Sequence, residues 1–230
     1  MSDITTKALS VQEWEEIQII EAATWTRKGW IDPETGKEYK AFPSFEGKLE
    51  RERGYQRKML DLFRISGLSG NVLDVGCGAT PILDQVAGNF IGIALDPNWG
   101  NYLTEHPFPH KCAICAHPAE EMPFPDNSFH HIISTNALDH FRDPRAALLE
   151  MLRVLRVGGT LWLSFCINNA TQGHPHPAHR IDLTIEDVAK WSNGLVETER
   201  AETIHYGWRN QDAALVVARK IFRPKMMPVV

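Results

Sequence analysis

The chain has 230 residues, 43% of them hydrophobic, which is enough for one well-packed domain with an extension. Its formal net charge of −5, without a dense Lys/Arg cluster, gives no electrostatic footprint for nucleic acid. No apolar run approaches a membrane span, and Met1-Ser2-Asp3 does not open a secretory signal. The four cysteines form no paired framework, so we expect a reducing cytoplasmic setting.

Two helices are expected before the first buried strand. Residues 10–13, Ser-Val-Gln-Glu, have the form of a capping box and start a helix that reaches about Arg27. A loop with several Gly and Pro residues follows. A second, charged helix is expected from Glu46 to Ser66, where Gly67 stops it.

Residues 71–81, Asn-Val-Leu-Asp-Val-Gly-Cys-Gly-Ala-Thr-Pro, are the most informative segment of the chain. An apolar run reaches Asp74, then Gly76 and Gly78 precede Pro81, which suits the first turn of a helix. This pattern predicts a buried strand, a tight turn that lets the backbone approach a ligand, and a helix N-terminus. A nucleotide-like cofactor is the expected ligand. The dinucleotide fingerprint G-x-G-x-x-G would need a third glycine at Pro81, which weakens the NAD alternative.

The rest of the chain alternates between strands and helices, which predicts a parallel sheet with crossover helices. Asp143-Pro144 is a good N-cap and first-turn pair for a helix that Gly158-Gly159 is expected to close. Residues 184–187 start the last helix. Residues 195–205 and 213–222 are expected to form a closing hairpin. The later parallel strands are expected to begin near Phe90, Lys111, His131 and Thr160.

Motifs along the chain resemble, in the same order, those of the class I S-adenosylmethionine (SAM)-dependent methyltransferases. Asp74, Gly76 and Gly78 match D-x-G-x-G-x-G, with Thr80 where the last glycine usually stands. Asp96 ends the second strand, 22 residues after Asp74. Residues 119–129 resemble A-E-x-L-P-F-x-D-x-S-F, and residues 149–159 contain a run that resembles E-x-x-R-V-L-K-P-G-G, with Arg156-Val157 in place of Lys-Pro. The resemblance covers roughly residues 50–222 and is closest to the small-molecule branch, which includes quinone and sugar methyltransferases.

This resemblance implies an α/β, Rossmann-like fold with a seven-stranded, mostly parallel sheet and a C-terminal antiparallel hairpin. Residues 1–66 are then an N-terminal helical extension or lid, and residues 67–230 are the SAM-binding methyltransferase domain. Ligands of open α/β sheets bind beyond the carboxyl ends of the strands, where the strand order reverses. The loops at that edge are therefore expected to contain the site.

The first three of these loops are expected to bind SAM. An acid at the end of the second strand can accept from both ribose hydroxyls, which points to Asp96. By resemblance, the glycine loop holds the methionyl part and the loop at Ala119-Glu120 holds the adenine. Pro118 stands where the family often has an acid for the adenine amino group. The expected cofactor-binding residues are Asp74, Gly76, Cys77, Gly78, Asp96, Pro97, Ala119, Glu120 and Asn136.

The loops after the fourth and fifth strands are expected to face the methyl acceptor. Residues 169–180 carry three histidines on a proline-stiffened segment, and Asp139-His140 follows the fourth strand. Histidine titrates near neutral pH and can take the proton of an acceptor hydroxyl. The candidate catalytic residues are His140 and His179 as first choices, with Asp139, His176 and His174. We assign no metal ligands, although a divalent metal held by Asp139 and this loop remains an alternative.

Cys112-x-x-Cys115 has the spacing of a zinc-binding pair. The segment falls where the third strand is expected, however, and residues i and i+3 of a strand point to opposite faces. We therefore interpret both cysteines as structural.

The sequence thus predicts a SAM-dependent methyltransferase that O-methylates a sugar or another polar hydroxylated metabolite. A small-molecule acceptor is the expected partner, with neither nucleic acid nor a membrane, and a homodimer is compatible with the sequence. Two alternatives stay open. One is a SAM-binding regulator or partner subunit without transferase activity, and the other is an NAD-dependent oxidoreductase.

Overall fold

A computed structural model describes residues 8–24, 30–31, 36, 38–39, 45–102, 109–167, 178–205 and 212–222. Seven strands form one sheet in the order β5-β4-β3-β6-β7-β9-β8. The parallel strands are β3 (Leu68–Val75), β4 (Gly88–Leu95), β5 (Ala113–Cys115), β6 (Phe129–Thr135) and β7 (Leu155–Cys166). β9 (Asp212–Lys220) runs antiparallel to β7 and to β8 (Val196–His205). The predicted fold class and closing hairpin are confirmed.

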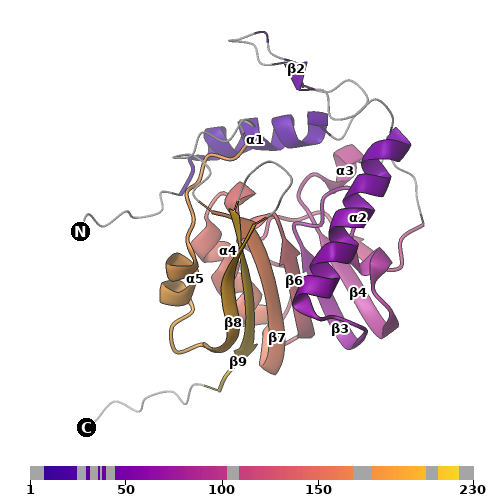
Figure 1. The fold of residues 1–230 in the computed structure, drawn as a ribbon. Coiled ribbons are helices and arrows are strands. Elements are labelled where there is room, and N and C mark those ends of the chain that lie inside the picture. The colour runs from indigo at the N-terminus through magenta and orange to yellow at the C-terminus, as the bar shows by residue number, and fades with distance from the viewer. Residues whose placement is uncertain are drawn as a thin grey trace.

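Helices cover both faces of the sheet (Figure 1). α2 (Phe45–Phe63) packs on one face, and α4 (Pro144–Val154) and α5 (Ile185–Trp191) pack on the other. Side chains alternate along a strand, so β3 feeds both cores: Val72 contacts the cluster under α2, whereas Leu73 joins the cluster under α4. This double burial explains why Val72 and Leu73, just before Asp74, are both apolar.

Three predicted helix starts are confirmed by their caps. The Ser10 hydroxyl accepts from the Glu13 N–H at 3.2 Å, and α1 (Val11–Thr24) follows. Asp143 accepts from the N–H of Ala146 at 3.0 Å at the start of α4. Thr184 and Asp187 form a reciprocal capping box at the start of α5. Each cap satisfies N–H groups that have no partner within the helix.

Two expectations about helices are wrong. No α-helix follows Pro81; the chain forms the single 3-10 turn η1 (Ile82–Gln85), because β4 begins soon afterwards at Gly88. The pair Gly158-Gly159 does not close α4, which ends at Val154 and passes directly into β7. Gly158 instead lies within β7 at a φ of +75°, beside an irregularity in the pairing with β6. Glycine adopts such a φ more readily than other residues, whether it ends a helix or lies in a strand.

α1 crosses the sheet at the carboxyl ends of the parallel strands (Figure 1). The Asn98 amide, in the loop after β4, donates to the Gln18 backbone oxygen at 3.0 Å and to its side-chain oxygen at 2.9 Å. Leu9 N–H donates to Arg142 O at 2.8 Å. The N-terminal extension therefore reaches the edge where a ligand is expected, while the exact division at residues 66 and 67 stays a prediction. β1 (Trp30–Ile31) and β2 (Glu38–Tyr39) pair with each other, and α3 (Trp99–Tyr102) follows β4.

No helix among the described residues has the length and apolar character needed to span a membrane.

Candidate functional site

Main-chain hydrogen bonds shape the glycine loop that follows β3. The N–H groups of Gly76 and Cys77 both donate to Leu95 O, at 2.8 and 3.2 Å. Gly76 and Gly78 have φ values of +71° and +59°, in the left-handed region that favours glycine. A Cβ on Gly76 would collide with the Ala137 side chain. The sequence motif therefore encodes a tight turn that packs against Ala137 and that a residue with a Cβ at position 76 would disturb.

Asp74 lies beneath this loop and links its two ends. Its carboxylate accepts from Ile82 N–H at 2.8 Å, and only 2% of the residue is exposed. Burial raises the pKa of Asp74 to about 8, although the hydrogen bond from Ile82 acts in the opposite direction. Its visible contact stabilises the loop, and direct binding of the cofactor by Asp74 stays a prediction.

Asp96 stands at the end of β4 beside the glycine loop. One carboxylate oxygen accepts from Gly78 N–H and the other from Asn98 N–H, each at 2.9 Å. Burial raises the pKa of Asp96 to about 6, against the effect of these two N–H donors. A carboxylate offers about four lone-pair sites, so two backbone bonds leave capacity for ribose hydroxyls. This arrangement fits the predicted ribose contact.

Cys77 lies within the glycine loop, and Asn136 follows the neighbouring strand β6. Cys77 is buried, its thiol lies 3.3 Å from Gly78 O, and burial raises the pKa of that thiol. Asn136 follows β6 with a φ of +53°, and its side-chain oxygen accepts from the Cys166 thiol at 3.2 Å. Both residues lie at the expected edge of the sheet, and their contacts to a cofactor stay predictions.

The remaining predicted cofactor residues, Ala119, Glu120 and Pro97, differ in exposure and in their contacts. Ala119 is 1% exposed and belongs to the core under α4, so its side chain contributes packing. Glu120 accepts from Asp143 N–H at 3.0 Å, which ties its loop to the start of α4. Pro97 is half-buried between Asp96 and Asn98. The adenine contact predicted for this region is therefore left mainly to the backbone and to the rest of the Glu120 carboxylate.

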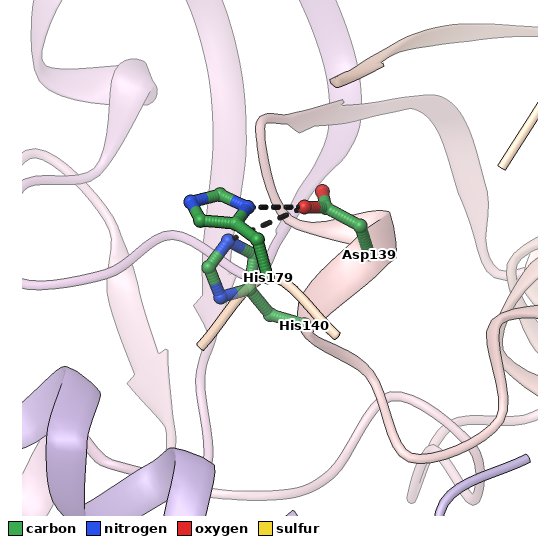
Figure 2. Close-up of side chains that lie close together, drawn as sticks. All are labelled: Asp139, His140 and His179. Atoms are coloured by element: carbon green, nitrogen blue, oxygen red, sulfur yellow. Dashed lines mark hydrogen bonds and ion pairs between the residues drawn. The ribbon is translucent and has the colours of Figure 1, made fainter. Parts of the chain in front are cut away.

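Asp139, His140 and His179 meet beyond the carboxyl end of β6 (Figure 2). Asp139 and His140 belong to η2 (Leu138–His140), and His179 comes from the segment after β7. The Asp139 carboxylate is fully buried and lies 2.5 Å from His179 Nδ1 and 3.7 Å from His140 Nε2. The two rings meet edge to face with centroids 4.4 Å apart. Three of the five predicted catalytic residues thus form one cluster.

Glu21 of α1 adds a second carboxylate to this cluster. Its carboxylate lies 3.4 Å from His140 Nδ1. Burial disfavours the His140 imidazolium, but the carboxylates of Asp139 and Glu21 outweigh burial and raise the pKa of His140 to about 9. Burial likewise acts to raise the pKa of Asp139, but His140 and His179 hold it below its usual value. The cluster can therefore hold a proton or another cation between carboxylates.

The other two catalytic candidates, His174 and His176, lie outside the described residues. Glu21 and Gln18 join α1 to the loops of the site, and neither was expected from the sequence. No motif surrounds Glu21 or Gln18 in the sequence. Only the docking of α1 across the strand ends brings them to the site, so a local signal could not have identified them.

The structure is that of an α/β protein with a glycine loop, an acid at the next strand end and a polar cluster, all at the edge of the sheet where such folds bind ligands. Residues 73–163 match the family described as "Methyltransferase domain". Sterol 24-C-methyltransferase of Aspergillus fumigatus is 28% identical over 193 residues, which cover 76% of this chain and 47% of that protein. Phosphoethanolamine N-methyltransferase of Triticum aestivum is 32% identical over 99 residues, covering 40% of this chain and 20% of that protein. The chain thus matches less than half the length of these relatives.

Among solved structures, the N-methyltransferase NodS of Bradyrhizobium japonicum in complex with S-adenosylhomocysteine has a TM-score of 0.61 at 17% identity. The match covers 90% of this chain and 98% of that one. Residues 73–163 therefore match a methyltransferase domain, and the chain has the fold of a solved methyltransferase, as the resemblance seen in the sequence predicted. SAM is the cofactor that the sequence predicts for this domain, and NodS is a protein of the same fold in complex with S-adenosylhomocysteine.

Proposed function

We propose that the chain transfers the methyl group of SAM to a hydroxyl of a small polar acceptor, such as a sugar. The relatives named above act on a sterol and on phosphoethanolamine, which supports a small-molecule acceptor while leaving its class open. The observation that carries the choice of a hydroxyl is the buried contact between Asp139 and His179. Such a polar cluster suits an acceptor that must lose a proton.

On the cofactor side, SAM supplies a methyl group on a sulfonium, which a nucleophile displaces in line. Asp96 would accept from the ribose hydroxyls with the lone pairs that Gly78 and Asn98 leave. The left-handed glycines would let the loop backbone approach the methionyl part without side chains between them. The reaction then depends mainly on alignment and on exclusion of water, to which α1 contributes by crossing the strand ends.

On the acceptor side, a hydroxyl is a poor nucleophile until its proton leaves. The Asp139 carboxylate orients His179 through Nδ1, and a carboxylate–imidazole pair can take up a proton. His140, between Asp139 and Glu21, completes the polar wall beside it. We therefore assign activation of the acceptor to the cluster of Asp139, His140 and His179, with His174 and His176 as further candidates from the same loop.

The experiment has two stages. Calorimetry with SAM, S-adenosylhomocysteine and NAD(H) tests cofactor preference first, and we expect binding of the two sulfur ligands only. The protein and SAM are then incubated with panels of sugars, phenols, amines and sterols, and products one methyl heavier are sought by mass spectrometry. Methylation confined to amines or to carbon would contradict the hydroxyl assignment. SAM binding without transfer to any panel would favour the alternative of a SAM-binding regulator or partner subunit.

A further inference from the structure

We propose that Asp139, His140 and His179 form a binding site for one divalent transition metal, of which Zn²⁺ is a representative. Among the residues that the structure describes, these make up the one group of three metal-binding side chains whose ligand atoms all lie within 4.8 Å of one another. The role of the metal rests on the proposed function, because the ion would lie where the acceptor hydroxyl is expected. Its binding can be tested without any acceptor.

The donor set defines the class of metal. Two imidazole nitrogens and one carboxylate oxygen suit Zn²⁺, Fe²⁺, Co²⁺ or Ni²⁺, whereas Mg²⁺ and Ca²⁺ prefer oxygen ligands alone. The three side chains leave coordination positions open for a water or an acceptor oxygen. The Asp139 side chain is fully buried, so packing of the surrounding residues restricts its movement. In Figure 2 both rings turn a nitrogen toward this carboxylate.

The contact of His140 with Glu21 independently supports the site. His140 directs Nε2 toward Asp139 at 3.7 Å, while Nδ1 lies 3.4 Å from Glu21 on the opposite side of the ring. A histidine that ligates a metal usually has its other ring nitrogen held by a carboxylate or carbonyl, which fixes the tautomer and the ring orientation. Glu21 holds the position of that outer partner. The outer part of the site is thus supplied by α1, more than a hundred residues earlier in the chain.

Charge also favours a divalent cation here. The carboxylates of Asp139 and Glu21 contact His140, and Asp96 acts on the same imidazole from a greater distance. Lys48 of α2 also interacts electrostatically with Glu21, but burial lowers the pKa of Lys48 to about 7, which weakens its competition with a metal ion. A divalent ion bound to Asp139 and the two imidazoles would place positive charge beside these carboxylates.

The sequence offers a second set of ligands in Cys112 and Cys115, but the structure separates them. Cys112 packs against the cluster under α2, and Cys115 packs against the cluster under α4. The two thiols therefore face opposite sides of the sheet, as the strand geometry predicted. A metal taken up by the chain is accordingly assigned to the histidine cluster.

The test is metal binding by the purified chain after treatment with a chelator. Calorimetric titration with Zn²⁺, and with Co²⁺ as a spectroscopic probe, should give one ion per chain and a visible Co²⁺ absorption typical of nitrogen and oxygen ligands. Asp139→Asn and His179→Ala should each weaken Zn²⁺ binding by about a hundredfold or more. Glu21→Gln, which alters only the outer partner, should weaken it by about 10–100-fold.

Two variants are matched controls. His205→Ala removes the imidazole of another His–Asp pair, 2.8 Å from Asp212 at the exposed hairpin, and Cys115→Ser removes a thiol. Both should bind Zn²⁺ as the parent does. Affinity for S-adenosylhomocysteine and the unfolding temperature of every variant establish that the fold is retained.

A parent chain that takes up no stoichiometric metal would overturn the proposal. So would Zn²⁺ affinity that is unchanged in both Asp139→Asn and His179→Ala. Methyl transfer that persists in the chelated, metal-free protein would remove the metal from the reaction and leave the proposed function intact. Stoichiometric metal binding at the cluster without transfer to any acceptor would contradict the proposed function alone.

Discussion

The site has two halves, one proposed to bind the cofactor and one proposed to bind the acceptor, and they differ in the chemical groups that form them. The cofactor half consists largely of backbone, with Gly76, Cys77 and Gly78 donating to Leu95 and Asp96 across two adjacent strand ends. The acceptor half consists of side chains from separate segments: Glu21 on α1, Asp139 and His140 in η2, and His179 after β7. Backbone geometry is shared by every chain with this turn, whereas a side-chain cluster is particular to one chain. We therefore expect the first half to determine the cofactor and the second to determine the acceptor.

Variants that affect only one half of the site would support this division of roles. A single substitution that impairs both cofactor binding and turnover would contradict it. Asp139→Asn is expected to have the largest effect. The amide keeps the size of the carboxylate but removes the charge that contacts His179 and His140, so turnover should fall by about a hundredfold or more. SAM affinity should stay within twofold of the parent, which calorimetry measures.

His205→Ala is the control, since the His205–Asp212 pair lies on the exposed hairpin. A parallel loss of SAM affinity and turnover in Asp139→Asn would show that the two halves are one unit.

Asp96→Ala is expected to have the next largest effect, and on the opposite half. It removes a carboxylate that can hydrogen-bond both ribose hydroxyls, each such bond contributing about 1.5–3 kcal/mol. SAM affinity should fall at least about tenfold. Because Asp96 also accepts from Gly78 and Asn98, the unfolding temperature must be measured beside the dissociation constant. An unchanged dissociation constant would assign the ribose contact to another residue.

The pH dependence of SAM binding is a finer test of the same residue. The pKa of Asp96 is raised to about 6, chiefly by burial. Ribose hydroxyls donate to the charged carboxylate, so the complex should bind the proton less tightly than the free protein. Affinity should then be constant above pH of about 6 and fall by up to about tenfold per unit as the pH drops below it. Asp96→Asn should flatten this profile; a fall that persists in the variant would implicate a different group.

The same contrast explains what could be predicted from the sequence. Gly78 and Asp96 are 18 residues apart and lie on neighbouring strand ends, so a local motif and the rule for parallel sheets suffice to join them. Asp139 and His179 are 40 residues apart, and the loop rule brings their segments to one edge without specifying which side chains meet. Glu21 required the docking of α1, for which the sequence has no motif.

The failed expectation at Pro81 has a related physical cause. Proline fits the first turn of a helix, but the short segment before Gly88 leaves space for only one 3-10 turn. The carboxylate of Asp74 then holds the N–H of Ile82. Local propensity correctly predicted that a helical turn begins after Pro81. The short distance to β4 limited that turn to the four residues of η1.

Glu16→Gln is expected to have the smallest effect and tests how α1 is held over both halves. Glu16 lies 3.1 Å from Arg180, next to His179, but both side chains are at least one-third exposed. An exposed ion pair contributes about 0–1 kcal/mol and is screened by salt, so the free energy of unfolding by urea should change by less than about 1 kcal/mol. Turnover and SAM affinity should stay at parental values, because Gln18 and Leu9 retain their hydrogen bonds to Asn98 and Arg142. Turnover could instead fall markedly in Glu16→Gln while high salt leaves the turnover of the parent unchanged. That result would mean that the acceptor half extends along α1 as far as this surface pair.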